Sequence, residues 1–256
     1  MKKIIVLFFS CIFIQNIWSQ EIRLILEKQP VMVKADNTKS IYMVDADNVL
    51  TKYSQAGQKK ASFSFQKYGQ ITKLDVTSPF QTMVHYGNAG IIIFLDGSFE
   101  KIGELNLAQF GLTNAGAVAL APDKSGFYIY DAANNMINKY DIRGQNTSEM
   151  GGFELTKVDA LIFNDEKLFI QGNDKLIITD ILGQNSETYL LKNVKIIDFY
   201  QKKLVGKNTE GKFVEIIPQT GETKPLSLPF QMELSDKIFV SQNYAFQIKD
   251  NVFLAY

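Results

Sequence analysis

The sequence predicts an all-β fold, a six-bladed β-propeller, from a recurring pair of apolar runs, a regular glycine spacing and the chain length. Each repeat begins with a short apolar run, which a polar turn and a second apolar run follow. Runs of this length, bounded by turn residues and without helical periodicity, are typical of β-strands. The first runs of the six repeats lie at residues 42–44, 82–85, 128–130, 168–170, 204–205 and 238–240.

Glycines mark the end of the second run in the first five repeats, and their spacing gives the repeat length. A tight turn between strands often needs a residue with positive φ, which glycine adopts without strain. The four spacings are 40, 47, 39 and 38 residues, with a mean of 41. A period of roughly 40–45 residues is typical of propeller blades with four strands each. The glycines are Gly57, Gly97, Gly144, Gly183 and Gly221.

The N-terminus has the order of segments found in a secretory signal peptide. Lys2 and Lys3 precede an apolar run at residues 4–14, and a polar stretch then ends at Ser19. The 11-residue run is shorter than the roughly 20 residues that a membrane-spanning helix needs. We therefore expect a signal peptide at 1–19 and a single propeller domain at 20–256, with no transmembrane span after processing. A buried first strand is the less favoured interpretation, because a pair of lysines rarely leads into a strand core.

This signal predicts a protein that is exported and is periplasmic, envelope-associated or secreted. Removal of residues 1–19 leaves 237 residues, close to six repeats of 41. The processed chain has 25 Lys and Arg against 27 Asp and Glu, a formal charge of −2, which does not fit a nucleic-acid partner or an anionic membrane surface. Cys11, the single cysteine, lies in the apolar run, so no disulfide and no thiolate metal site are expected. The apolar residues on both sides of Cys11 argue against a lipid anchor there.

The two ends of the chain are expected to share one blade. An apolar strand at residues 21–26 precedes the first full repeat, and the last repeat, at 231–256, lacks the glycine turn. Pairing of the N- and C-terminal strands in a closing blade would complete the ring and leave only short, protected edges.

Residues 128–145 carry the clearest repeat motif and read YIYDAANNMINKYDIRGQ. A strand is followed by Asp, an Asn-rich turn, a strand that ends in an aromatic residue, and then Asp and Gly. This pattern resembles the NHL repeat at Tyr130, Asp131, Asn134, Asn135, Ile137, Tyr140, Asp141 and Gly144. A weaker copy at 41–58 keeps Asp45, Asn48, Tyr53 and Gly57. The resemblance implies a six-bladed propeller; it covers two blades, and the other repeats match by spacing alone.

The sequence offers no recognisable catalytic centre. His85 is the single histidine, and we interpret it as a half-buried packing or surface residue on an alternating strand rather than as a catalyst. One histidine without a cysteine in the processed chain cannot complete a soft metal site. No nucleophile elbow and no Gly-rich phosphate loop are present. No catalytic residue is therefore assigned.

Asn and Asp recur in the turn that follows the first run of each repeat, here called the middle turn. In propellers these turns lie on one face, so they could form a rim that binds a partner, a polar ligand or calcium, since carboxylate and amide oxygens suit that ion. The alternative is a purely structural role, because Asn and Asp tolerate positive φ and hydrogen-bond their own backbone. The residues are Asp47, Asn48, Asn88, Asn134, Asn135, Asn173, Asp174, Asn208 and Asn243.

A Lys-x-Asp pattern occurs near two of the innermost strands. Lys73 and Asp75 form one copy, Lys157 and Asp159 the other, and Asp198 lies at a related place in a later repeat. Their spacing from the following turns is not constant, so we interpret them as hydrogen-bonding residues at strand ends rather than as a ring of metal ligands.

The leading functional hypothesis is a non-enzymatic binding or scaffolding propeller, acting through protein–protein interaction in the cell envelope. Its partner would be a protein or a polar ligand, and no cofactor is expected, with calcium left open. The alternative is a calcium-dependent hydrolase, lactonase or lyase of the six-bladed kind. Loops on a rigid scaffold serve recognition in both cases.

Overall fold

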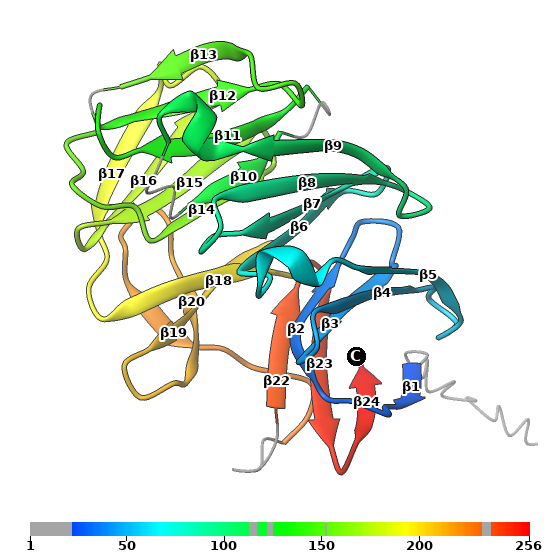
Figure 1. Cartoon of the computed structure of the whole chain (residues 1–256). Helices are drawn as coiled ribbons and strands as arrows, with labels where there is room; N and C mark the ends of the chain where they lie inside the picture. The colour runs from blue at the N-terminus through cyan, green and yellow to red at the C-terminus, as the bar shows by residue number, and fades with distance from the viewer. Residues whose placement is uncertain (1–21, 113–116, 122–124, 152, 232–236) are drawn as a thin grey trace, which may run out of the picture.

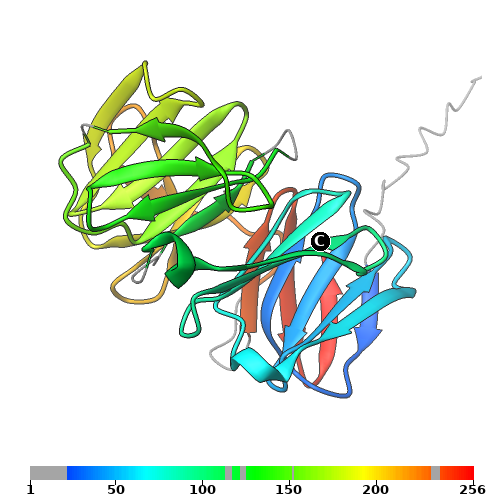
Figure 2. The same cartoon turned by 45° about the horizontal axis from the view of Figure 1, so that its top comes forward.

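The computed structural model describes residues 22–112, 117–121, 125–151, 153–231 and 237–256, and it shows six antiparallel sheets of four strands each. The sheets follow one another around a ring in chain order, as the colours in Figures 1 and 2 show. Their innermost strands contact one another from blade to blade. The chain is therefore a six-bladed β-propeller, and the prediction of this fold class is confirmed.

In the first five blades the strands run in chain order from the centre outward. Two short 3₁₀ helices, η1 (Gln66–Tyr68) and η2 (Leu107–Phe110), lie in the connections after blades 1 and 2. The strands are, in blade 1, β2 (Pro30–Ala35), β3 (Ile41–Asp45), β4 (Val49–Tyr53) and β5 (Lys59–Ser64); in blade 2, β6 (Lys73–Ser78), β7 (Gln81–Tyr86), β8 (Ile91–Asp96) and β9 (Lys101–Asn106); in blade 3, β10 (Val118–Leu120), β11 (Phe127–Asp131), β12 (Met136–Tyr140) and β13 (Asn146–Met150); in blade 4, β14 (Ala160–Asn164), β15 (Lys167–Gly172), β16 (Lys175–Asp180) and β17 (Ser186–Leu190); and in blade 5, β18 (Val194–Tyr200), β19 (Lys203–Asn208), β20 (Phe213–Ile216) and β21 (Thr223–Pro225).

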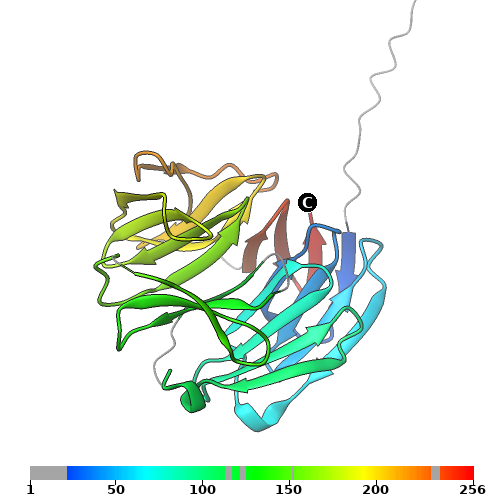
Figure 3. The ribbon, with the colours of Figure 1, turned by 90° about the horizontal axis from the view of Figure 1, so that it is seen from above.

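Blade 6 is built from both ends of the chain, as expected. From the centre outward it contains β22 (Lys237–Ser241), β23 (Tyr244–Lys249), β24 (Val252–Ala255) and β1 (Ile22–Ile25). The pairing of β1 with β24 runs from Ile22 opposite Ala255 to Ile25 opposite Val252, and Figure 3 shows the blue and red strands at this junction. Since the fourth strand comes from the N-terminus, the last repeat needs no third turn, which explains its missing glycine.

The sixth apolar run is assigned wrongly by the sequence pattern. Residues 238–240 lie in β22, an innermost strand, whereas the runs at 42–44 and 168–170 lie in the second strands β3 and β15. The last repeat is therefore displaced by one strand relative to the expectation. Its middle turn is the one between β23 and β24, at Asp250 and Asn251.

The apolar core lies between the blades. Within the described residues it divides into six clusters, each formed by two neighbouring blades. At the closure, Phe246 and Phe253 stack with ring centroids 5.4 Å apart, and both are fully buried. Each blade thus buries both of its faces, which is why strands such as β7 have no exposed side.

The third turns, between the third and fourth strands, account for the glycine period. Gly144 has φ of 83°, and a Cβ there would come within 2.2 Å of the Phe110 ring, so both conformation and space require glycine. In blade 2 the positive φ belongs to Phe99, at 70°, and not to Gly97. Because Gly97 lies two positions before Phe99, the spacing of 47 residues from Gly97 to Gly144 exceeds the turn-to-turn spacing in this part of the chain by two.

The signal peptide expected at residues 1–19 lies outside the described residues. Among the residues that are described, no helix has the length and apolar character needed to cross a membrane.

Candidate functional site

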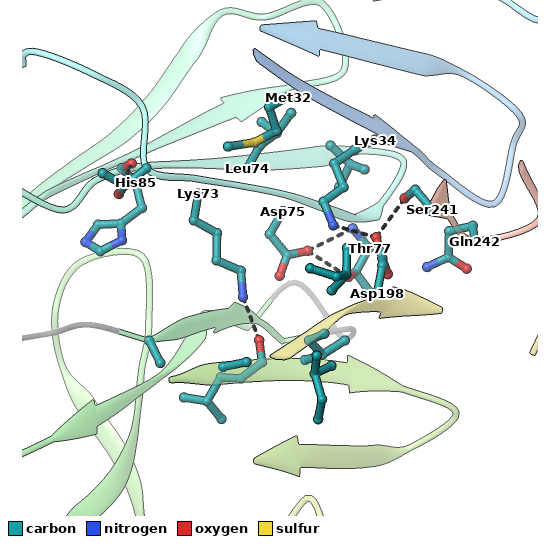
Figure 4. A pocket seen from close by; sticks show the side chains of 18 of the residues that line it. Met32, Lys34, Lys73, Leu74, Asp75, Thr77, His85, Asp198, Ser241 and Gln242 are labelled. Carbon is teal, nitrogen blue, oxygen red and sulfur yellow. Dashed lines mark hydrogen bonds and ion pairs between the residues drawn. The ribbon is translucent and has the colours of Figure 1, made fainter. Parts of the chain in front are cut away.

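A cavity of about 550 Å³ lies at the centre of the ring, between the innermost strands. Side chains of β2, β6, β14, β18 and the end of β22 line it. Figure 4 shows its charged and polar groups, which come from opposite sides of the ring. The volume falls within the roughly 300–1,000 Å³ of typical small-molecule sites, so the channel is the first candidate for a functional site.

Asp198 joins three blades at one part of the cavity. Its Oδ2 accepts from Lys34 Nζ at 2.5 Å and from Ser241 Oγ at 2.9 Å. The Ser241 hydroxyl in turn accepts from the Ala35 amide at 3.1 Å, and the other Asp198 oxygen accepts from the Phe199 amide at 2.7 Å. Blades 5, 1 and 6 are therefore tied together by one buried carboxylate.

Asp75 makes a second connection between blades. Its Oδ2 accepts from the Leu120 amide of blade 3 at 2.9 Å. Its Oδ1 accepts from the amide and the hydroxyl of Thr77, at 3.0 and 2.7 Å. Asp75 and Asp198 thus act as hydrogen-bonding residues on innermost strands, as interpreted from the sequence, but they lie within β6 and β18 and not at the expected strand ends. Asp159 instead lies at the cavity edge and forms an exposed ion pair with Lys157.

Lys73 reaches across the cavity. It begins β6 in blade 2, and its Nζ donates to the Leu161 carbonyl of β14, in blade 4, at 2.6 Å (Figure 4). Removal of the ammonium from water lowers the pKa of Lys73 to about 8, while Asp75 and Asp198 act in the opposite direction and Lys34 lowers it further. At neutral pH the Lys73 side chain is therefore still mainly a cation, but it loses its proton at a lower pH than an ordinary lysine.

His85 is buried beside Lys73, contrary to the expectation of a half-buried or surface residue. It pairs across strands with Lys73 and lines the cavity, its side chain is 2% exposed, and its Nε2 has no hydrogen-bond partner. Burial, with a smaller effect of the nearby Lys73 charge, lowers the pKa of His85 to about 4. The imidazole is therefore neutral at physiological pH.

The burial of His85 predicts a loss of stability in mild acid. The unfolded chain, with an ordinary histidine pKa near 6.5, binds this proton more readily than the folded chain, so stability is full above pH 6.5 and is lost as the pH falls through about 4. The expected loss is about 3 kcal/mol. Urea unfolding of wild type and His85→Gln between pH 7 and 4 measures it, and His85→Gln should show a flatter dependence. Equal slopes would contradict the prediction, and since His85 is the single histidine, no other imidazole obscures the comparison.

Two of the predicted rim residues fix the connections between blades. Asn48 donates to the Gly69 carbonyl at 2.7 Å and accepts from the Ile71 amide at 2.9 Å. Asn173 accepts from the amides of residues 156 and 157, at 3.2 and 3.1 Å, and donates to the Thr156 hydroxyl at 2.7 Å. Both have positive φ, 61° and 51°. The side-chain amides of Asn48 and Asn173 therefore hold the backbone of the rim in place.

The other predicted residues are distributed rather than gathered. Asn134 bonds to Asp131, Asn135 accepts from Tyr130, and Asn208 accepts two amides of its own turn. Asp47 pairs with Lys28, and the backbone carbonyl of Asp174 accepts from the Leu191 amide. Asn88 is exposed in the turn between β7 and β8. These turns lie on one face of the ring, but no group of three or more Asp, Glu, His or Cys within the described residues could hold a metal ion.

The placement of Asn243 on this rim is wrong. It lies between β22 and β23, the innermost and second strands of blade 6. That turn belongs to the opposite face, because successive turns of an antiparallel blade alternate between its ends. The error follows from the one-strand displacement of the last repeat.

Asn173→Ala is expected to destabilise the fold by about 1–2 kcal/mol. The change removes three hydrogen bonds to the connection before blade 4 and places alanine at a φ of 51°. Lost hydrogen bonds and a positive φ each lower the free energy of unfolding by about 1 kcal/mol or more. The matched variant Asn88→Ala, in the equivalent turn of blade 2, should be close to neutral. Urea unfolding of both proteins measures the difference, and equal midpoints would show that the Asn173 bonds do not hold the rim.

Sequence reasoning missed Lys34 and Ser241 as channel residues. Lys34 stands between Val33 and Ala35, both buried, in an otherwise apolar strand. A lysine at such a position is the signal that could have identified it, because a buried cation needs a partner. Ser241 carries no comparable signal, since short hydroxyl side chains are common at strand ends.

No protein-family model and no curated protein sequence matches the chain. Among solved structures, a streptogramin B lyase is similar with a TM-score of 0.60 and 15% identity, over 93% of this chain and 86% of that one. BamB from Moraxella catarrhalis is similar with a TM-score of 0.51 and 13% identity, over 87% of this chain and 81% of that one. The WD40 repeats of RRP9 are similar with a TM-score of 0.61 and 11% identity, over 91% of this chain and 78% of that one. At these identities the similarity shows the propeller fold alone, which a lyase and WD40 repeats share.

Proposed function

We propose that this chain is a non-enzymatic binding propeller that is exported and holds a protein partner in the cell envelope. The observation that supports this proposal best is the fixed rim. Asn48 and Asn173 hold the connections between blades by side-chain hydrogen bonds, so the loops of one face are rigid before any partner arrives. Preorganised loops on a rigid scaffold bind with a smaller entropic cost.

We also propose that the repeats of this propeller are of the NHL type. In the two blades that resemble the motif, its first Asp closes the middle turn: Asp45 accepts the amides of residues 47 and 49, and Asp131 those of residues 133 and 134. The second Asp of the better copy, Asp141, caps the third turn in the same way. The turn-closing hydrogen bonds of these Asp residues give a physical reason for Asp at both positions of the motif.

The partner surface can be tested by photo-crosslinking in the source cells. A crosslinking amino acid in place of Asn88, on the rim, is expected to capture a discrete protein. The same residue in place of Glu166, which is exposed between β14 and β15 on the opposite face, should not. Capture from Glu166 alone, or from neither position, would overturn the proposal.

Calcium separates this function from a calcium-dependent enzyme. Saturating calcium at a hundredfold excess over Kd would stabilise a calcium-binding fold by about 2.7 kcal/mol, which is roughly 5–10 °C in Tm at this size. We propose that no such shift occurs, because the Asn48, Asn173 and Asn208 side chains already bond to the backbone and the described residues contain no cluster of three carboxylates that could hold the ion. A large shift that Asn134→Ala and Asn173→Ala abolish would favour the enzyme.

A further inference from the structure

The charged groups of the central cavity leave the Lys73 ammonium without a direct ion-pair partner. Lys34 is paired with Asp198, Asp75 is bonded to Thr77 and Leu120, and Asp159 pairs with Lys157. Within the described residues, no carboxylate lies within ion-pair distance of Lys73, whose Nζ is bonded to the Leu161 carbonyl. A half-buried ammonium whose bonded partner is a carbonyl attracts an anion, because no directly paired carboxylate replaces its lost hydration.

A second, independent group points to a ligand at the same place. The His85 side chain is 98% buried, lines the cavity beside Lys73, and has an Nε2 without a partner. Buried polar atoms in native proteins are normally hydrogen-bonded, and an exception calls for an explanation. A neutral imidazole with its proton on Nε2 can donate one hydrogen bond to an anion without adding charge.

Apolar side chains complete the cavity. Met32, Ile162 and Ile197 come from blades 1, 4 and 5, and all three are only partly buried while lining it. A volume of about 550 Å³ exceeds what a bare inorganic ion needs. Around Lys73 the cavity therefore offers a cation without an ion pair, the neutral His85 donor and an apolar wall.

We propose that the central cavity binds a small organic carboxylate, with its carboxylate on Lys73 and His85 and its apolar part against Met32, Ile162 and Ile197. A single negative charge fits better than a phosphate dianion, because Asp75 and Asp198 lie nearby on the cavity wall and would repel a second negative charge. This site lies in the channel and does not depend on a partner at the rim. Its failure and the failure of the proposed function are therefore separate results.

Calorimetric titration tests the site with 4-phenylbutyrate, its uncharged amide 4-phenylbutanamide, and inorganic phosphate. Wild type should bind the carboxylate with a Kd below about 1 mM, which requires only about 4 kcal/mol of binding energy. The amide and phosphate should bind at least tenfold more weakly. No saturation by the carboxylate, or equal binding of the amide, would overturn the proposal.

Variants identify the residues. Lys73→Gln should weaken binding of 4-phenylbutyrate at least tenfold and His85→Gln about threefold or more, whereas Lys167→Gln, which is exposed at the start of β15, should not change it. Circular dichroism confirms that each variant is folded. If Lys73→Gln is folded and binds like wild type, the proposal is wrong. If Lys73→Gln does not fold, Lys73→Met takes its place, with loss of binding again expected.

The dependence on pH gives a further readout. The groups that surround Lys73 are His85 on β7, Lys34 on β2, Asp75 on β6 and Asp198 on β18, with Asp159 and Lys195 at the cavity edge. Since Lys73 loses its proton near pH 8, the affinity for 4-phenylbutyrate should fall from pH 7 to pH 9 and be lost most steeply above pH 8. An affinity that is constant across this range would contradict a role for the ammonium.

Discussion

A chain that ends at Lys249 is expected to show no cooperative unfolding transition. Deletion of residues 250–256 removes β24, which pairs with β23 on one side and with β1 on the other. It exposes Phe246 and Ile22, which are buried in the full chain, and leaves β1 without a partner. Because all six blades depend on ring closure, the loss should extend beyond one blade. Thermal and urea unfolding followed by circular dichroism measure the transition.

The reference for this deletion is a chain of residues 22–256. A second chain that lacks 22–26 removes β1 alone, the exposed outermost strand of blade 6, and should unfold earlier yet still cooperatively. If the chain ending at Lys249 melts at the same temperature as the reference, the termini do not lock each other.

Asp198→Ala is the point substitution with the largest expected effect, about 3 kcal/mol. It removes the partner of Lys34 and leaves this lysine, whose side chain is 21% exposed, without a counter-ion. Loss of one member of a buried pair costs about 3–5 kcal/mol, and the partial exposure of Lys34 places this case at the lower end. The Tm should fall by roughly 6–12 °C, as differential scanning calorimetry would measure.

Asp159→Ala is the matched control. Asp159 also lines the cavity and also pairs with a lysine, but its side chain is 35% exposed and that of Lys157 is 75% exposed. Exposed pairs contribute at most about 1 kcal/mol. A comparable loss of Tm in both variants would show that the Asp198 bonds between blades stabilise the fold no more than an exposed ion pair does.

The fold could be predicted because its markers are local. A glycine such as Gly144 is required by the backbone of its own turn, so the period is visible without any knowledge of contacts. The marker is absent where a turn is absent, and blade 6 has no third turn. Residues 238–240 therefore resemble the second-strand run at 42–44, although they form the innermost strand.

The channel could not be predicted to the same extent, because its contacts cross the ring. Lys73 and the Leu161 carbonyl are 88 positions apart, and no spacing rule relates them. The position of His85 was misjudged for a related reason: alternation implies one exposed face, whereas every residue of β7 is buried between two neighbouring blades. Asn48 and Asn173 were found as turn residues, but their bonds to the connections required the structure.

The order in which the chain leaves the ribosome sets the order in which this ring can be completed. Among the described strands, β1 is the first to be synthesised and its partner β24 is the last. Until then β1 is an unpaired apolar segment on an otherwise growing set of blades, and such edges invite association with other chains. Among the described pairings, that of Ile22 with Ala255 spans the greatest sequence separation, and it can form only after β24 has been synthesised. Conditions that slow synthesis of the last repeat should prolong the interval in which the first strand must be protected.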